Sequence, residues 1–233
     1  MSDQRVVAVA EGFTADVFHE LLQLAIEGKG KLPGAKQAAN QLLAQRSDPE
    51  AAVSRMIAQH VAMAGGQGFA TNWGGFFVSL LTIPANIAAS SFLQARLVSG
   101  IAHLRGYEVS DPRVRTAILM VMLGPGAMAH LVSTGVLPSS PLVVATAPVF
   151  DARLDGQVSR ALLDRALNQV TGKRLGLRLA RGIPLVGGGV GAAVDGWSTR
   201  AIAIHAMNEF PSRRPRTSSG HAEGASEASG PAE

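Results

Sequence analysis

The sequence predicts an all-α protein, a single multi-helix bundle of about seven to nine helices. Two Asp-Pro pairs, beginning at Asp48 and Asp111, each place a capping carboxylate before a proline at the first helical position. Between turns rich in glycine and proline, apolar residues recur at the three-to-four spacing of amphipathic helices. Charged residues make up only 16% of the chain, fewer than the roughly 25% of an ordinary soluble domain. The composition therefore favours helices that are largely buried or that meet a membrane.

The individual helices follow from these patterns in chain order. A turn from Gly28 to Gly34 separates the first two amphipathic segments, and the Asp-Pro pairs begin two further helices. Gly124-Pro125-Gly126 ends the second of these. The predicted helices cover 15–26, 35–45, 49–63, 112–123 and 156–169, and a last helix ends near Phe210.

The folded domain is expected to cover residues 1–210. Residues 211–233 are rich in serine, glycine, alanine and glutamate, so they are expected to form a disordered tail. Near the N-terminus Asp3 precedes Arg5, and the run of valine and alanine that follows is too short for a signal peptide. Cysteine is absent, so nothing indicates an oxidising compartment, and the cytoplasm is the default location.

A long stretch without formal charge, Met56–Ala95, contains His60 as its one titratable side chain. Roughly 20 apolar residues would span a bilayer, but Pro84 and several polar side chains interrupt this stretch. It is expected to span the membrane, to dip into it as a helical hairpin, or to pack just above it. A second glycine-rich apolar segment runs from Arg181 to Trp197. The two segments are expected to pack together at the centre of the bundle or to insert in lipid.

The basic residues are concentrated in one part of the chain. The net charge is +4, and 151–181 is the region richest in lysine and arginine. Its last part contains a membrane-surface basic cluster, namely Lys173, Arg174, Arg178 and Arg181. Each cation could contribute about 1 kcal/mol of attraction to an anionic leaflet, and a solvated helix face explains the spacing equally well. Nucleic acid is not an expected partner, because the few aromatic residues do not form an RNA-binding pattern.

Motifs for nucleotide, metal and hydrolase chemistry are not supported by their context. Gly187 to Ala192 satisfies G-x-G-x-x-A, but Pro184 interrupts the strand that a dinucleotide site needs before its glycines. Gly188, Ala192 and Gly196 lie four apart, and we predict that they let another helix approach closely. The histidines lack metal-ligand spacing and no G-x-S-x-G elbow occurs. Neither a metal, a cofactor nor a catalytic residue is therefore predicted.

Several sequence blocks, taken in their order and spacing, resemble the EcsC family of bacterial proteins. The blocks lie at 32–35, 68–84, 94–96, 101–107, 111–124 and 183–210. Together they extend over about 15–210, which makes the match specific although each block is weak alone. The resemblance implies a bacterial helical protein that is cytoplasmic or membrane-associated, from a family named for members encoded beside ABC-type exporter components. It implies no reaction. The weak charge of Met56–Ala95 departs from the family pattern.

The resemblance and the composition favour a membrane-associated accessory protein at the cytoplasmic face of the membrane, either peripheral or partly inserted. It would bind anionic membrane lipid or a membrane-protein partner such as an ABC-type exporter, without catalysis. The alternative is a lipid-handling, hydrolase-like enzyme with a polar site buried among apolar helices, and a cytoplasmic location also stays open. An enzyme needs a cleft where several polar groups converge, whereas a binding protein needs only an apolar groove with a basic rim.

Four polar residues are candidates for a ligand site or an ion pair, namely Asp195, Arg200, Arg96 and Gln94. Asp195 lies among valine, glycine and alanine, where an unpaired carboxylate would be costly. Arg96 or Arg200 could neutralise it in a buried or half-buried ion pair that fixes the register of the helices. The other hypothesis is that the carboxylate contacts a ligand.

The two hypotheses for Asp195 give different results on substitution. If it forms a buried ion pair, Asp195→Ala leaves a guanidinium unpaired and lowers the free energy of unfolding by roughly 3–5 kcal/mol. A double-mutant cycle with Arg96 or Arg200, read by chemical denaturation, then shows coupling. If Asp195 contacts a ligand, Asp195→Asn keeps its stability and loses function in a complementation assay. Normal stability together with normal function in Asp195→Asn contradicts both hypotheses.

Overall fold

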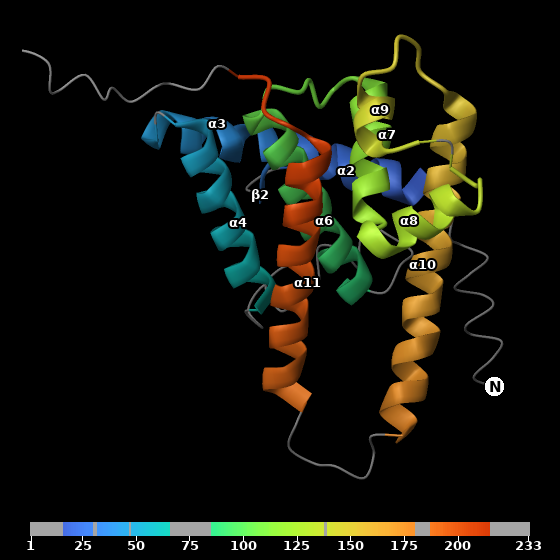
Figure 1. The fold of residues 1–233 in the computed structure, drawn as a ribbon. Coiled ribbons are helices and arrows are strands. Elements are labelled where there is room, and N and C mark those ends of the chain that lie inside the picture. The colour runs from blue at the N-terminus through green and yellow to red at the C-terminus, as the bar shows by residue number, and fades with distance from the viewer. Residues whose placement is uncertain are drawn as a thin grey trace, which may run out of the picture.

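The computed structural model describes residues 16–29, 32–46, 48–65, 85–137, 139–179 and 187–214 (Figure 1). It describes the backbone alone at 29, 32, 65, 85–87, 169–179 and 187–195. Within these residues the protein is all-α, as predicted, with nine helices and one short antiparallel hairpin. The elements are α2 (Asp16–Glu27), β1 (Gly28–Lys29), β2 (Leu32–Pro33), α3 (Ala35–Gln45), α4 (Pro49–Gly65), α6 (Ala85–Leu104), α7 (Pro112–Met122), α8 (Pro125–Ser133), α9 (Pro141–Ala145), α10 (Ala152–Leu179) and α11 (Gly187–Glu209).

The bundle is built around α6. Helices α2, α3, α4, α7 and α11 all pack on it, and from Ala88 to Leu104 most of its side chains are buried. Small residues make this close packing possible. A Cβ atom added to Gly100 would lie 2.1 Å from Sδ of Met56 on α4, far inside van der Waals contact. Glycine at this position therefore sets the distance between α4 and α6.

Helix α4 runs antiparallel to both α6 and α11. Glu50 near the start of α4 pairs with Arg105, which directly follows α6, and His60 near its end contacts Arg96 in the middle of α6. Arg105 also reaches the carbonyl of Phe210, just beyond α11. The end of α4 therefore lies on the same side of the molecule as the beginnings of α6 and α11, and α10 ends there too (Figure 1). We call this side the α10–α11 end.

Most helix boundaries agree with the sequence predictions, because capping residues, prolines and glycines begin and end the helices as expected. The Asp111 carboxylate accepts a hydrogen bond of 2.9 Å from the backbone N–H of Arg113, and Pro112 follows it as the first residue of α7. Helix α7 stops where Gly124 adopts a φ of +80°, a conformation that favours glycine. The prediction of 156–169 was wrong in length, since α10 covers 152–179. Gly172 and Gly176 lie inside this helix, where each is tolerated at a cost of about 1 kcal/mol.

Helices α7 and α8 are separated by a sharp bend. The two helix axes meet at 106° across Gly124. No single helix among the described residues is long and apolar enough to cross a bilayer, and this bent pair alone meets that test when its two helices are counted together. Residues 66–84, the centre of the predicted membrane segment, lie outside the described residues.

The predicted boundary of the tail at residue 211 needs correction, because residues 211–214 belong to the described fold. The backbone N–H of Arg213 donates to the carbonyl of Arg105 at 2.9 Å, and its guanidinium lies 4.1 Å from the ring centroid of Tyr107. Arg214 donates to the carbonyl of His103 at 3.3 Å. Composition reports how much apolar surface a segment can bury, but it does not report polar and cation–π contacts such as these. Residues 215–233 lie outside the described residues.

Two truncations test where the folded chain stops contributing to stability. Ending the chain after Arg214 should leave the thermal midpoint within about 1 °C of the full-length value, because residues 215–233 have little apolar surface to bury. Ending it after Pro211 removes the Arg213 and Arg214 contacts, which together contribute about 1–2 kcal/mol. The expected drop in midpoint is then about 3–6 °C by calorimetry. Equal midpoints for the two truncations would show that these contacts contribute nothing.

Candidate functional site

Arg96 lies on α6, and its side chain contacts both β2 and α4. Its Nε donates to the carbonyl of Pro33 at 3.0 Å, and its Nη1 lies 3.4 Å from Nε2 of His60. Burial lowers the pKa of His60 to about 4, so the ring is neutral near pH 7. Its Nδ1–H then donates to the carbonyl of Met56 at 2.9 Å, which leaves Nε2 to accept from Arg96. In the described structure Arg96 thus serves the packing of three elements.

The four candidate residues of the predicted ligand site are placed as follows. Arg96 and Gln94 are half-buried on α6, whereas Arg200 is exposed on α11. The side chain of Asp195 lies outside the described part, so its ion pair with Arg96 or Arg200 stays a prediction. The three with described side chains do not line the cleft between α8 and α10 that is described below.

The predicted helix-packing glycines and the basic cluster are described only in part. Helix α11 packs against α4 at Gly196, where an added Cβ would lie 3.8 Å from Val61, an ordinary contact distance. The site would accept alanine, so the predicted close approach of helices through small residues stays a prediction. Six further predicted residues are not described at side-chain level, namely Gly188 and Ala192 of α11, Lys173, Arg174 and Arg178 of α10, and Arg181.

A serine, a histidine and an aspartate that are scattered in the sequence meet where α2 crosses α10. Nε2 of His19 lies 3.1 Å from Oδ2 of Asp155 and 3.0 Å from Oγ of Ser159. The Thr116 hydroxyl donates to the other oxygen of Asp155 at 2.5 Å. The hydrogen bond with Asp155 raises the pKa of His19. Burial alone would raise the pKa of Asp155, but the bonds from His19 and Thr116 outweigh it and lower that pKa.

This cluster does not have the geometry of a hydrolase triad. In a triad the acid binds one imidazole nitrogen and the nucleophile binds the other, whereas here Asp155 and Ser159 share Nε2 of His19. Ser159 is also buried, with 1% of its surface exposed, so a substrate would not reach its hydroxyl. We therefore assign the cluster to the attachment of α10 to α2 and α7. No group of acidic and histidine side chains in the described residues could hold a metal ion.

Arg105 lies where α4 begins and α11 ends, and it makes three side-chain hydrogen bonds there. Its Nη2 donates to Oε2 of Glu50 at 2.6 Å, and its Nη1 donates to the carbonyl of Phe210 at 3.1 Å. The carbonyl of Met207 accepts from the same nitrogen. These bonds satisfy carbonyl groups that the last turn of α11 leaves without helical partners. Arg105 is therefore a structural residue that fixes the start of α4 to the end of α11.

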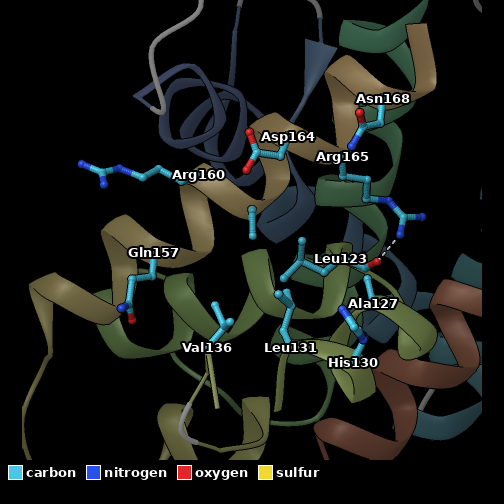
Figure 2. Close-up of a pocket in the computed structure, with 11 residues that line it drawn as sticks. Leu123, Ala127, His130, Leu131, Val136, Gln157, Arg160, Asp164, Arg165 and Asn168 are labelled. Carbon is cyan, nitrogen blue, oxygen red and sulfur yellow. Dashed lines mark hydrogen bonds between the residues drawn. The ribbon is translucent and has the colours of Figure 1, made fainter. Parts of the chain in front are cut away.

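A cleft of about 680 Å³ lies between α8 and the first half of α10 (Figure 2). Its walls contain five apolar residues, namely Leu123, Ala127, Leu131, Val136 and Ala161. Its polar lining comes from Gln157, Arg160, Asp164, Arg165 and Asn168 of α10 and from His130 of α8. The arrangement is an apolar groove with charged groups along one edge, the pattern expected of a binding protein.

Arg165 is the charged residue most firmly held in this cleft. Its Nη1 donates to the carbonyl of Leu123 at the end of α7, as Figure 2 shows. The side chain is half-buried, and desolvation lowers its pKa. Arg160 and Asp164 are exposed on the rim. The cleft was not predicted from the sequence, although Gln157, Ala161 and Arg165 are spaced four apart and lie on one face of α10.

Comparisons with known protein families, curated proteins and solved structures found no match for this chain. The resemblance to the EcsC family therefore stays a prediction that rests on the sequence blocks. Two of those blocks are in contact in the structure, since Arg96 of one donates to Pro33 of the other. Gly34 in the same block touches the carbonyl of Ile26 so closely that a Cβ would lie 2.3 Å from its oxygen.

The charge state of His19 gives a pH-dependent prediction. Because its pKa is raised in the folded state, its contribution to stability is fully present below the unfolded value of about 6.5 and is lost as pH rises through the folded pKa. The lowered pKa of Asp155 keeps the pair formed down to acid pH. His19→Gln should therefore lower the free energy of unfolding by roughly 1 kcal/mol at about pH 5.5 and by less at about pH 8.5.

The measurement is urea denaturation of both proteins at the two pH values. In an Asp155→Asn background the same substitution should show no such pH dependence, because the partner charge is gone. A loss of stability that is equal at both pH values would contradict the assignment.

Proposed function

We propose that this protein is a non-catalytic binding protein that associates with the cytoplasmic face of a bacterial membrane through its α10–α11 end. The observation that carries the proposal is the antiparallel packing of α4 on α6 and α11. As a result, α4 and α10 end at this one side of the bundle, and α6 and α11 begin there. Two connections therefore join helix ends at this side, one between Gly65 and Ala85 and the other between Leu179 and Gly187. The first of these connections has no charged residue.

Charge is distributed in a way that supports this orientation. Toward the other end of the bundle, where α4 and α10 begin and α6 and α11 finish, acidic and basic side chains pair with each other, as Glu50 does with Arg105. Three residues of the basic cluster, Lys173, Arg174 and Arg178, belong to the last turns of α10 at the α10–α11 end, and Arg181 follows that helix in the sequence. Basic side chains beside uncharged segments suit a surface of anionic headgroups.

An exposed tryptophan adds a second feature typical of membrane contact. Trp197 lies at the middle of α11, and 74% of its surface is exposed. Tryptophan is enriched where proteins meet the membrane–water interface, because its ring is apolar and its N–H can still bond to water or headgroups. A large exposed indole on a helix that begins at this end is therefore consistent with an interfacial position.

The alternative, a lipid-handling enzyme, has less support. The Ser159–His19–Asp155 cluster lacks triad geometry, and Arg96 is engaged in packing. An ABC-type exporter as the partner rests on the resemblance alone. Binding to anionic lipid is the part of the proposal that the described helices support most directly.

Vesicle binding tests the proposal. Sedimentation with vesicles of equal parts phosphatidylglycerol and phosphatidylcholine should carry down the wild-type protein, and pure phosphatidylcholine vesicles should carry down far less. The triple variant with Lys173, Arg174 and Arg178 changed to Gln should bind the anionic vesicles about a hundredfold more weakly, since each cation contributes about 1 kcal/mol.

The matched control is a triple variant that removes the same charge elsewhere, with Arg46, Arg55 and Arg153 changed to Gln. These three residues are exposed and lie outside the basic cluster. If this control loses as much affinity as the cluster variant, attraction depends on net charge and not on the α10–α11 end. Equal binding of the wild type to neutral and anionic vesicles would also contradict the proposal.

A further inference from the structure

The cleft between α8 and α10 has the size and the wall chemistry of a small-molecule site. Its volume of about 680 Å³ falls in the range of roughly 300–1,000 Å³ that is usual for such sites. The apolar wall is left accessible in the described structure, since Leu131 is only half-buried and Val136 is 46% exposed. Covering such surface contributes about 25 cal/mol for each Å². An apolar chain of matching length would therefore be stabilised along this wall.

The cleft is fixed by the surrounding structure. Helix α8 turns away from α7 by 106° at Gly124, so that the corner of the two helices faces the side of α10. Arg165 of α10 donates to the carbonyl of Leu123 at that corner. Its Nη atoms lie within contact distance of the position that a Cβ on Gly124 would take. The bend at Gly124 and this hydrogen bond thus fix the position of the α7–α8 corner relative to α10, and with it the width of the groove.

The charge in the cleft is not balanced. Its lining contains two arginines and one aspartate, and among the described residues no carboxylate forms an ion pair with Arg165. A guanidinium has five N–H donors, and the bond to Leu123 uses one of them. A half-buried cation is costly unless an anion or a set of acceptors compensates it. The polar edge of the cleft therefore suits a negatively charged group.

We infer that this cleft binds a single-chain amphipathic molecule with an anionic head. The head bonds to Arg165, and the chain lies along Leu123, Leu131 and Ala161. The exposed side chain of Arg160 points away from Arg165 (Figure 2) and adds only longer-range attraction. A carboxylate and a phosphate monoester share the required head chemistry, because both accept parallel N–H bonds from a guanidinium. This site is separate from the membrane surface proposed above, since it lies on the first half of α10 and the basic cluster lies at its other end.

Isothermal titration calorimetry with defined probes tests the inference. Decanoate and decyl phosphate supply a chain with each kind of anionic head, decanol supplies the chain alone, and butyrate supplies a carboxylate with a short chain. At least one of the two anionic ten-carbon probes should bind at one site per chain. Decanol and butyrate should each bind about tenfold or more weakly, because each lacks one of the two contacts.

Three variants locate the site. Arg165→Gln should weaken the anionic probe about tenfold or more and leave decanol unchanged. Ala161→Phe should abolish binding of every probe by filling the groove from α10, and Arg153→Gln, an exposed arginine of the same helix outside the cleft, should bind as the wild type does. Arg165 also bonds to the residue that follows α7, so Arg165→Gln could destabilise the fold. If Arg165→Gln fails to fold, Arg160→Gln replaces it with a smaller expected loss of affinity. If Ala161→Phe fails to fold, Ala127→Phe replaces it.

The result that overturns the inference is equally specific. It is wrong if no probe gives one-site binding, if decanol binds as tightly as the anionic probes, or if the filled variant binds like the wild type. Occupation of the cleft by a second copy of the chain would appear as a dimer that Ala161→Phe dissociates, and that outcome also overturns it. The Lys173, Arg174 and Arg178 variant should keep probe affinity, so failure here and failure of the membrane proposal remain distinguishable.

Discussion

Gly100 of α6 lies directly against the side chain of Met56 on α4, with room for no additional atom. The same helix buries Ala88, Ala95 and Ala102 completely, and α2, α3, α4, α7 and α11 pack around it. Close-packed interiors tolerate little change in volume, since an inserted methyl group displaces its neighbours at a cost of about 1–3 kcal/mol. The spacing of most of the bundle therefore depends on small side chains along one helix, and a larger residue at Gly100 would move α4 together with the α11 helix that leans on it.

Two arginines also hold these helices in place, and they do so through hydrogen bonds. Arg96 in the middle of α6 donates to the carbonyl of Pro33, and Arg105 after its end donates to Glu50 and to carbonyl groups at the end of α11. A guanidinium can bond to several acceptors at fixed angles, so one side chain can join segments that are far apart in sequence. The cost of burying these cations is offset by those bonds. Arginines within an apolar sequence thus serve assembly here, and Arg96 does so by bonding α6 to β2 and α4.

The features that local sequence determines could be predicted, and those that depend on distant segments could not. The start of α7 follows from Asp111 and Pro112, and its end follows from the glycine that adopts positive φ at 124. Helix α10 was predicted too short, because glycines count against a helix in isolation but are tolerated in a long one. The cleft needs α8 and α10 to face each other, and the His19 cluster needs α2 to meet α10. No spacing in the sequence reports either meeting, and the resemblance to a family without an established reaction supplied no residues for them.

Helix α10 links the two proposed binding regions, and its anchoring decides whether they influence each other. Its first half is attached to α2 and α7 through Asp155, which bonds to His19 and Thr116. Arg165 adds a bond to the corner of α7 and α8. A ligand that fills the cleft would contact both α8 and α10 and so add a further attachment just beyond these two. Because a helix transmits the orientation of one end to the other over its length of 28 residues, the bound ligand would restrict the directions available to the basic end of α10. Ligand binding would then favour membrane binding when the restricted orientation is the one that reaches the headgroups, and by linkage the membrane would raise the affinity of the cleft by the same factor.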